Sequence, residues 1–197
     1  MSVVDAIIKV RKPQPRVPVI DVISKRFSPR VFSTESISQE LIERIFEAAR
    51  LTPSARNIQP WFFYGVKKNT TPFEKMKHCI PERNGWALKA PFIVIACYNP
   101  NGLDGLKNNW AQYDLGAAVM SLVLQAQELG IYARQIGSFD AKETKSQFDI
   151  QDPLIPFTLI AMGKQGSEED YQNASKEYVD KDLIPPVRKA TIYNELI

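Results

Sequence analysis

Residues 92–98, Phe-Ile-Val-Ile-Ala-Cys-Tyr, form a continuous apolar run with no charged or amide side chain among them. A strand with one solvent-facing side alternates apolar and polar residues, whereas a strand covered on both sides is apolar along its whole length. The run is also far shorter than the ~20 residues needed to span a bilayer. It therefore predicts a central β-strand between two layers of packing elements.

Patterns for further strands and helices lie on both sides of this run. Aromatic and β-branched residues bounded by turn residues predict strands at 61–66, 131–136 and 156–162. Apolar residues at three- and four-residue steps predict helices at 19–26, 36–52, 73–80 and 110–129. Strands that alternate with helices favour α/β or α+β layers over an all-α or all-β fold.

The helix predicted at 36–52 has signals at both of its ends. Ser36 and Gln39 have the spacing of a capping box, in which each side chain satisfies a backbone N–H at the helix start. Pro53 follows the last apolar position and cannot continue a helix. We therefore expect the helix to begin at Ser36 and to stop before Pro53.

The helix predicted at 110–129 is apolar around most of its circumference. Gly116 and Met120 lie opposite its main apolar stripe, and Gly130 stands at the expected C-terminal stop. A helix with this composition is buried on all sides. We expect it to be either central in the fold or covered by a second subunit.

The two ends of the chain differ from the middle. Three prolines between positions 13 and 18 prevent a helix there and favour an extended arm. After Gly163 the sequence becomes polar, and residues 168–182 lack a clear core stripe. We therefore divide the chain into an N-terminal extension, residues 1–18, and a single domain, residues 19–197.

The composition is that of an ordinary globular protein. Of the 197 residues 44% are hydrophobic and 24% charged, and the formal net charge is only +3. The sequence has no dense basic stripe for nucleic acid and no apolar stretch of membrane-spanning length. The first eleven residues are too short and too acidic for a signal peptide. We expect a cytoplasmic protein that binds neither nucleic acid nor membrane.

The sequence lacks several common catalytic motifs. We find no Gly-x-Gly-x-x-Gly, no phosphate-binding Gly-Lys-Ser/Thr loop and no Gly-x-Ser-x-Gly elbow. Cys79 and Cys97, with the single His78, cannot form a disulfide framework or a zinc site without carboxylates. A His78–Cys79 nucleophile is disfavoured because adjacent side chains rarely point at each other.

Two polar stretches are candidates for a binding site. Residues 25–30, Lys-Arg-Phe-Ser-Pro-Arg, place basic groups around a hydroxyl, and arginine donates paired hydrogen bonds to phosphate. Residues 52–61, Thr-Pro-Ser-Ala-Arg-Asn-Ile-Gln-Pro-Trp, join a helix to a strand, where ligand-binding loops are common. Taken singly, each stretch is also compatible with a solvated basic turn or a capped structural turn.

Together and in this order, the two stretches resemble the nitroreductase family. Its most specific signature is Arg-aromatic-Ser-Pro-Arg, here residues 26–30, followed by Pro-Ser-x-x-Asn-x-Gln-Pro-Trp, here residues 53–61. The resemblance also includes Asp-Leu-Gly-Ala-Ala at 114–118, Ile-Gly-Ser-Phe-Asp at 136–140 and the basic pair 188–189. It extends over roughly residues 19–190.

The resemblance implies an α+β fold: a three-layer α/β/α sandwich with a central mixed, mainly antiparallel sheet. It further implies an intertwined homodimer with two FMN molecules at the interface. The cofactor-binding residues that it implies are Arg26, Phe27, Ser28, Arg30, Pro53, Ser54, Ala55, Asn57, Gln59, Ile136, Gly137, Ser138, Arg188 and Lys189.

Each group of these residues has an expected role by resemblance. Residues 26–28 and 188–189 would hold the phosphate and ribityl chain, and Arg30 would reach the pyrimidine edge of the ring. Residues 53–59 would contact the ring from the other subunit, and residues 136–138 would present a backbone N–H to flavin N5. Asn84 is our candidate for a further ring-edge contact.

The implied activity is that of an FMN-dependent NAD(P)H oxidoreductase without a protein acid or base. NAD(P)H and an acceptor, such as a nitroaromatic compound or a quinone, would react in turn in a ping-pong cycle with the flavin. Two alternatives remain open: an enone reductase or dehalogenase of the same fold, and a flavin-binding sensor or store without turnover.

Overall fold

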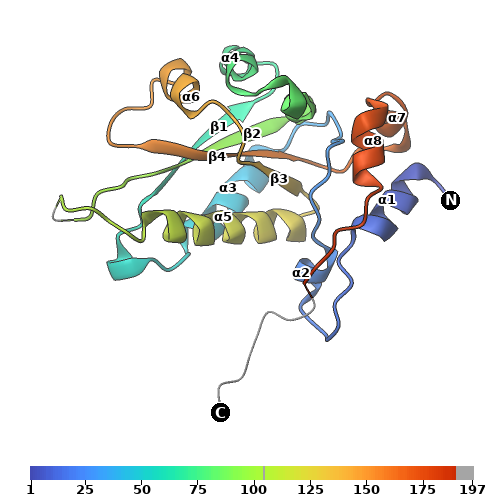
Figure 1. The fold of residues 1–197 in the computed structure, drawn as a ribbon, viewed down its shortest axis with the longest axis horizontal. Coiled ribbons are helices and arrows are strands. Elements are labelled where there is room, and N and C mark those ends of the chain that lie inside the picture. The colour runs from blue at the N-terminus through green and yellow to red at the C-terminus, as the bar shows by residue number, and fades with distance from the viewer. Residues whose placement is uncertain (104, 190–197) are drawn as a thin grey trace.

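The computed structural model describes residues 1–103 and 105–189 of the chain (Figure 1). Strands and helices alternate along most of this length. In chain order the elements are α1 (Val3–Arg11), α2 (Asp21–Lys25), α3 (Gln39–Arg50), η1 (Ala55–Asn57), β1 (Trp61–Lys67), α4 (Thr71–Cys79), η2 (Glu82–Lys89), β2 (Phe92–Tyr98), α5 (Ala111–Glu128), β3 (Tyr132–Ile136), α6 (Ala141–Gln147), β4 (Ile155–Gly163), α7 (Glu168–Gln172) and α8 (Lys176–Asp182).

The described strands form one sheet in the order β1-β2-β4-β3, with every neighbouring pair antiparallel. β2 lies in the interior of the sheet, where Val94 pairs with Gly65 of β1 and with Ile160 of β4. All of its residues are buried. The predicted central strand and the mainly antiparallel sheet are therefore confirmed.

Helices cover both faces of the sheet, as Figure 1 shows, with α3 and α5 on one side and α4 and α6 on the other. Alternate residues of β2 face the two layers: Val94 packs in the cluster of α3 and α5, whereas Ile93 and Ile95 pack in that of α4 and η2. This is the alternation of side chains expected of a strand. The three-layer α+β sandwich is confirmed.

Helix α3 begins later than the capping-box spacing predicts. Ser38, not Ser36, is its N-cap, and the Ser38 hydroxyl accepts a hydrogen bond from the Leu41 N–H at 3.3 Å. Ile37, which precedes the cap, and Ile42 are both buried in the same cluster. Such a hydrophobic pair across the helix start fixes where the chain enters the helix. The serine beside the buried isoleucine therefore becomes the cap.

Helix α5 is buried on one face only. Leu115, Ala118 and Leu122 are fully buried against the sheet, whereas Tyr113 is 73% and Met120 38% exposed. Of the two sequence-based alternatives, a helix buried on all sides by its own chain is therefore wrong. The exposed face is the one that a second subunit would have to cover.

The two ends of the described chain meet at one side of the sandwich, where α1 lies beside α7 and α8 (Figure 1). The Glu168 carboxylate of α7 accepts hydrogen bonds from the Val3 and Val4 N–H groups at the start of α1, at 2.9 and 3.2 Å. Ile7 of α1 is fully buried with Phe27. The sequence had indicated no helix in either segment.

None of the helices in residues 1–103 and 105–189 has both the length and the hydropathy that a membrane span requires.

Candidate functional site

The segment that carries the first candidate motif is anchored in the core at both ends. Phe27 is buried, and its ring lies 4.9 Å from that of Tyr132 on β3. At the other end, the Val31 carbonyl accepts a hydrogen bond from the Gly166 N–H at 3.2 Å. A Cβ on residue 166 would lie only 2.8 Å from Val31 Cγ1, so only glycine allows this approach. The side chains of residues 26, 28 and 30 are thereby held in place, whereas the Phe27 ring belongs to the core.

Three guanidinium groups converge on Ser28. Arg134 of β3 donates to the Ser28 carbonyl oxygen at 2.6 Å, and Arg11 of α1 donates to the same oxygen at 3.4 Å. Arg26 donates to the Ser28 hydroxyl at 3.2 Å. The sequence singled out Arg26 and Ser28, whereas Arg11 and Arg134 were missed.

Arg30 is tied to a buried carboxylate. Its backbone N–H and its Nη1 donate to the two oxygens of Asp182, at 2.7 and 2.9 Å. The Asp182 side chain is 0% exposed and that of Arg30 is 18% exposed. Asp182 is the last residue of α8, in the polar segment where the sequence gave no core pattern. It is the one carboxylate hydrogen-bonded to these arginines in the described part of the chain.

Burial and the mutual repulsion of positive charges lower the pKa values of two arginines in this cluster, Arg26 and Arg134. Burial lowers the pKa of Arg26, and the nearby charges of Arg188 and Arg11 lower it further. Burial, with the charges of Arg30 and Arg11, lowers the pKa of Arg134 to about 10, against the opposing effect of Asp182. A shift in this direction means that the surroundings penalise the cation. An anion bound among these groups would relieve that penalty, so the cluster is suited to phosphate.

Beside this cluster lies a pocket of about 260 Å³ that joins several predicted residues. Its lining includes Arg30, Arg134 and residues 136–138. Asn84, the candidate for a ring-edge contact, also lines it and donates to the Ser138 carbonyl oxygen at 2.9 Å. Trp86 is also among its lining residues, and the Arg134 guanidinium lies 5.1 Å from the indole centroid. The structure therefore brings Arg30, Ile136, Gly137, Ser138 and Asn84 to one site.

The second candidate motif, residues 53–59, is a strained loop. Arg56, Asn57 and Gln59 have φ values of 53°, 55° and 52°, in the left-handed region that disfavours side chains larger than glycine. The Gln59 N–H donates to the Ser54 hydroxyl at 2.9 Å and so closes the loop. Backbone strain of this kind persists where the surroundings enforce it, and it clusters at functional sites.

The loop and the arginine cluster lie at opposite ends of α5 (Figure 1). At one end the Ala55 N–H donates to Asp114, in the first turn of the helix, at 3.1 Å. At the other end Lys25, the last residue of α2, interacts electrostatically with Glu128, the last residue of α5. At 1.5 Å of rise per residue, Asp114 and Glu128 are roughly 21 Å apart. Pro53, Ser54, Ala55, Asn57 and Gln59 therefore do not join the Arg30 pocket of their own chain.

The last two predicted residues lie beyond α8. Arg188 is exposed and close enough to Arg26 and Arg11 to lower the pKa of both. The structure therefore places Arg188 close to the arginine cluster, and its role in binding phosphate stays a prediction. Lys189 is exposed, and no contact in the described chain joins it to the cluster.

The missed residues have no local sequence signal. Arg134 stands inside a strand, Asp182 in a charged helix, and Arg11 in a segment that we expected to be an extension. They reach Ser28 and Arg30 only through the tertiary fold. Within the described residues, no group of histidine, cysteine and carboxylate side chains is placed to hold a metal ion.

Comparisons with known proteins identify the family of the chain. The model of the Nitroreductase family matches residues 23–77 and 66–164. A protein of Archaeoglobus fulgidus, provisionally named NADH dehydrogenase/NAD(P)H nitroreductase, is 30% identical over 164 residues, which are 81% of this chain and 92% of the relative. A protein of the same provisional name from Methanothermobacter thermautotrophicus is 30% identical over 74% of this chain and 76% of its own length.

Solved structures share the fold at lower sequence identity. An oxidoreductase containing FMN superposes with a TM-score of 0.82 at 23% identity, over 93% of this chain and 96% of its own. CLA-ER, an enone reductase of gut-bacterial fatty acid metabolism, superposes with a TM-score of 0.66 at 21% identity, over 75% of this chain and 88% of its own. With the family model spanning most of the chain, the sequence motifs and the sandwich architecture lead to one assignment. The chain belongs to the nitroreductase family.

Proposed function

We propose that this chain, an oxidoreductase of the nitroreductase family, binds FMN and transfers a hydride from NAD(P)H to a small organic acceptor such as a nitroaromatic compound or a quinone. The observation that carries the proposal is the convergence of Arg11, Arg26 and Arg134 on Ser28, beside a pocket of about 260 Å³ that is lined in part by Trp86 and residues 136–138. The FMN content of the structurally similar oxidoreductase supports the same cofactor.

The described residues fit the phosphate of FMN. Arg26 and the Ser28 hydroxyl, which are hydrogen-bonded to each other, would contact the phosphate, and Arg188 would add a further positive charge close by. A phosphate dianion receives charge-assisted hydrogen bonds from such groups, which are roughly twice as strong as neutral ones. The repulsion that lowers the pKa of Arg26 in the chain alone would then become attraction to the ligand.

The adjoining pocket would hold the flavin ring. FMN bound there would supply the hydride chemistry itself. Arg30 would place a positive charge at the pyrimidine edge, where it would stabilise the negative charge that reduction adds. Asp182 would keep the Arg30 side chain in that orientation through its two hydrogen bonds. The backbone at Gly137 and Ser138 would face the ring, and the Asn84 amide would hold the Ser138 carbonyl in place.

A homodimer would complete the site. The strained loop at 53–59 lies too far from the Arg30 pocket of its own chain, so it would contact the ring bound to the other chain. The exposed face of α5, with Tyr113 and Met120, is the surface that the second copy would cover. Dimers built on one repeated surface patch are the commonest oligomers.

The first experiment is a visible absorption spectrum of the protein reconstituted with FMN, before and after anaerobic addition of NADH or NADPH. We expect flavin bands that bleach with at least one nucleotide, and then return on addition of a nitroaromatic compound or a quinone. Return with an enone alone would select the enone reductase alternative. Flavin bands that neither nucleotide bleaches would select a flavin-binding protein without turnover. Absence of flavin bands after reconstitution would refute the proposal.

The dimer needs a separate measurement. We expect sedimentation equilibrium to give twice the mass of the chain, 22.4 kDa, at micromolar concentration. A monomer that still binds FMN tightly would show that residues 53–59 do not belong to the cofactor site.

A further inference from the structure

Helix α1 lies before the part of the chain that the family model matches, which begins at residue 23. It is nevertheless built into the fold. Its N-terminus is capped twice, by Ser2 and Asp5 locally and by Glu168 of α7. Ile7 is fully buried next to Phe27, which is the residue that precedes Ser28. The helix is therefore fixed directly against the segment of the arginine cluster.

The last residue of α1, Arg11, connects two parts of the cofactor site. Its Nη2 donates to the Ser28 carbonyl oxygen at 3.4 Å, and its Nη1 donates to the Ile184 carbonyl oxygen at 3.1 Å. Ile184 begins the short stretch that leads through Pro185 and Pro186 to Arg188. The Arg11 guanidinium therefore holds both the segment around Ser28, where the phosphate would bind, and the start of the segment that carries Arg188.

The remaining donor of Arg11 is unusual. Its Nε is buried and has no hydrogen-bond partner among the described residues. Burial lowers the pKa of Arg11, and the charges of Arg30 and Arg188 add to this effect against the attraction of Asp182. A buried, unsatisfied donor on a charged group costs free energy. A nearby anion would offset that cost.

We propose that Arg11 is a positioning residue for the phosphate of the bound cofactor, supplied by a helix that precedes the part of the chain matched by the family model. Arg11 fixes the Ser28 segment and the Arg188 segment relative to each other and adds its own positive charge to the anion site. The inference rests on the proposed function, because it assigns a residue to the phosphate half of the FMN site. The N-terminal extension is on this view part of the cofactor site.

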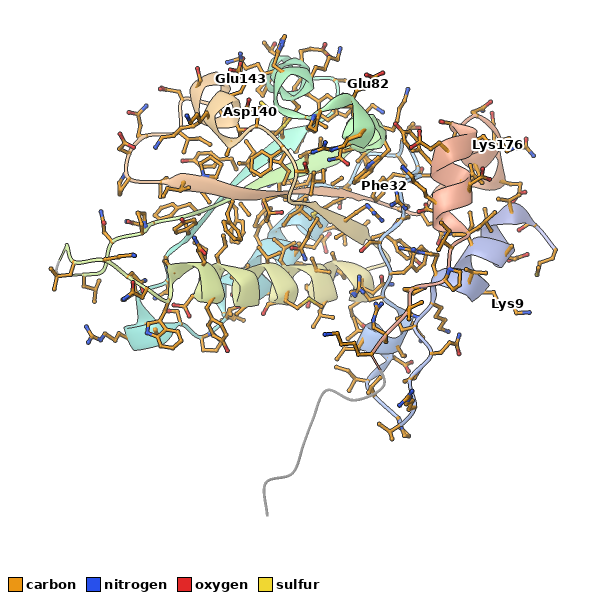
Figure 2. All side chains as sticks on the ribbon, in the orientation of Figure 1. Lys9, Phe32, Glu82, Asp140, Glu143 and Lys176 are labelled. Atoms are coloured by element: carbon orange, nitrogen blue, oxygen red, sulfur yellow. The ribbon has the colours of Figure 1, made fainter. Side chains whose placement is uncertain are left out.

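The test compares two ligands that differ only in the phosphate, FMN and riboflavin. Dissociation constants are measured by quenching of flavin fluorescence for the wild-type chain and for Arg11→Met, which keeps a long apolar stem without charge or donors. The matched control is Lys9→Met on the same last turn of α1. Lys9 is exposed and extends away from the molecule, as Figure 2 shows. A milder variant, Arg11→Lys, keeps the charge but loses the planar fork.

We expect Arg11→Met to raise the Kd for FMN roughly tenfold, because the variant loses a positive charge beside the phosphate and the hydrogen bonds that position Ser28 and the Arg188 segment. The Kd for riboflavin, which has no phosphate, should rise less than about twofold. Arg11→Lys should raise the Kd for FMN by a smaller factor with riboflavin again unchanged, and Lys9→Met should change neither.

Either of two results in the Arg11 variants would overturn the inference: unchanged FMN affinity in Arg11→Met, or an equal loss of affinity for both ligands. The second result would show that α1 only supports the fold. If Arg11→Met fails to fold, Arg11→Lys gives the same comparison. A wild-type chain that binds riboflavin as tightly as FMN would overturn the inference while leaving a flavin site. A wild-type chain that binds neither would refute the proposed function, and the inference with it.

Discussion

Replacement of Asp182 by asparagine removes the only carboxylate that pairs with Arg30 in the described chain. Asp182 accepts two hydrogen bonds from Arg30, at 2.7 and 2.9 Å, and its side chain is 0% exposed. Removing one partner of a buried ion pair costs about 3–5 kcal/mol, because the other charge stays buried without compensation. The asparagine oxygen can still accept one of the two hydrogen bonds. We therefore expect the free energy of unfolding to fall by about 3 kcal/mol, at the lower end of that range.

The assay is urea unfolding followed by circular dichroism at one fixed protein concentration, since a dimer unfolds in a concentration-dependent way. In a chain of this size the same loss lowers the Tm by roughly 6–12 °C. The matched control is Asp180→Asn, which makes the same chemical change at an exposed position of α8. Surface substitutions of this kind stay within about 0.5 kcal/mol. If Asp182→Asn also stays within about 0.5 kcal/mol, the pair does not hold the α8 end onto the Arg30 segment.

Three further predictions concern the phosphate cluster, the strained loop and the thiols. Arg26→Ala should raise the Kd for FMN roughly tenfold by removing a phosphate partner, whereas Arg44→Ala on the exposed side of α3 should not; equal affinities would exclude the phosphate assignment. Arg56→Gly should raise the free energy of unfolding by about 1 kcal/mol, because glycine adopts its φ of 53° without strain. The matched control, Arg44→Gly within a helix, should lower the free energy of unfolding by about 1 kcal/mol. If both substitutions changed the free energy of unfolding in the same direction, this reasoning would be contradicted. Burial raises the pKa of Cys79, and that of Cys97 to about 12, so a thiol reagent near pH ~8 should modify the chain only after denaturation. In the unfolded chain the Cys97 thiol has its ordinary pKa of 9.0, so the free energy of unfolding should fall as the pH rises from there to about 12, and it should fall less steeply in Cys97→Ala.

The central part of the fold follows from patterns within single segments. The run at 92–98 is apolar along its whole length because both faces of β2 are covered. The apolar residues at 110–129 recur every three or four positions because they lie on one side of α5. The segments at the two ends of the chain lack such patterns. Helix α1 is stabilised in part by Glu168, which lies far along the chain, and no local rule relates the two.

The candidate site likewise has one part that local sequence patterns indicate and another part that only the tertiary fold creates. Arg26, Ser28 and Arg30 stand in one short motif, so their proximity could be predicted from spacing, whereas Gly137 and Ser138 were expected only from the family resemblance. Arg134 and Asp182 each stand among residues that give no hint of a ligand, and they meet the motif only because β3 and α8 pack beside it. The start of α3 shows the same limit, since burial of Ile37 selected Ser38 over Ser36 as the cap.

The length of α5 separates the two halves of the proposed cofactor site in one chain, and in the proposed dimer this has a consequence for mixtures of subunits. One chain with a damaged Arg26 and another with a damaged Asn57 would each form inactive homodimers. In a mixed dimer, one of the two cofactor sites would combine the intact arginine cluster of one chain with the intact loop of the other. The second site would contain both substitutions. Two inactive variants expressed together would therefore restore activity, as in complementation between alleles of one gene. Two lesions within the same half would not complement each other.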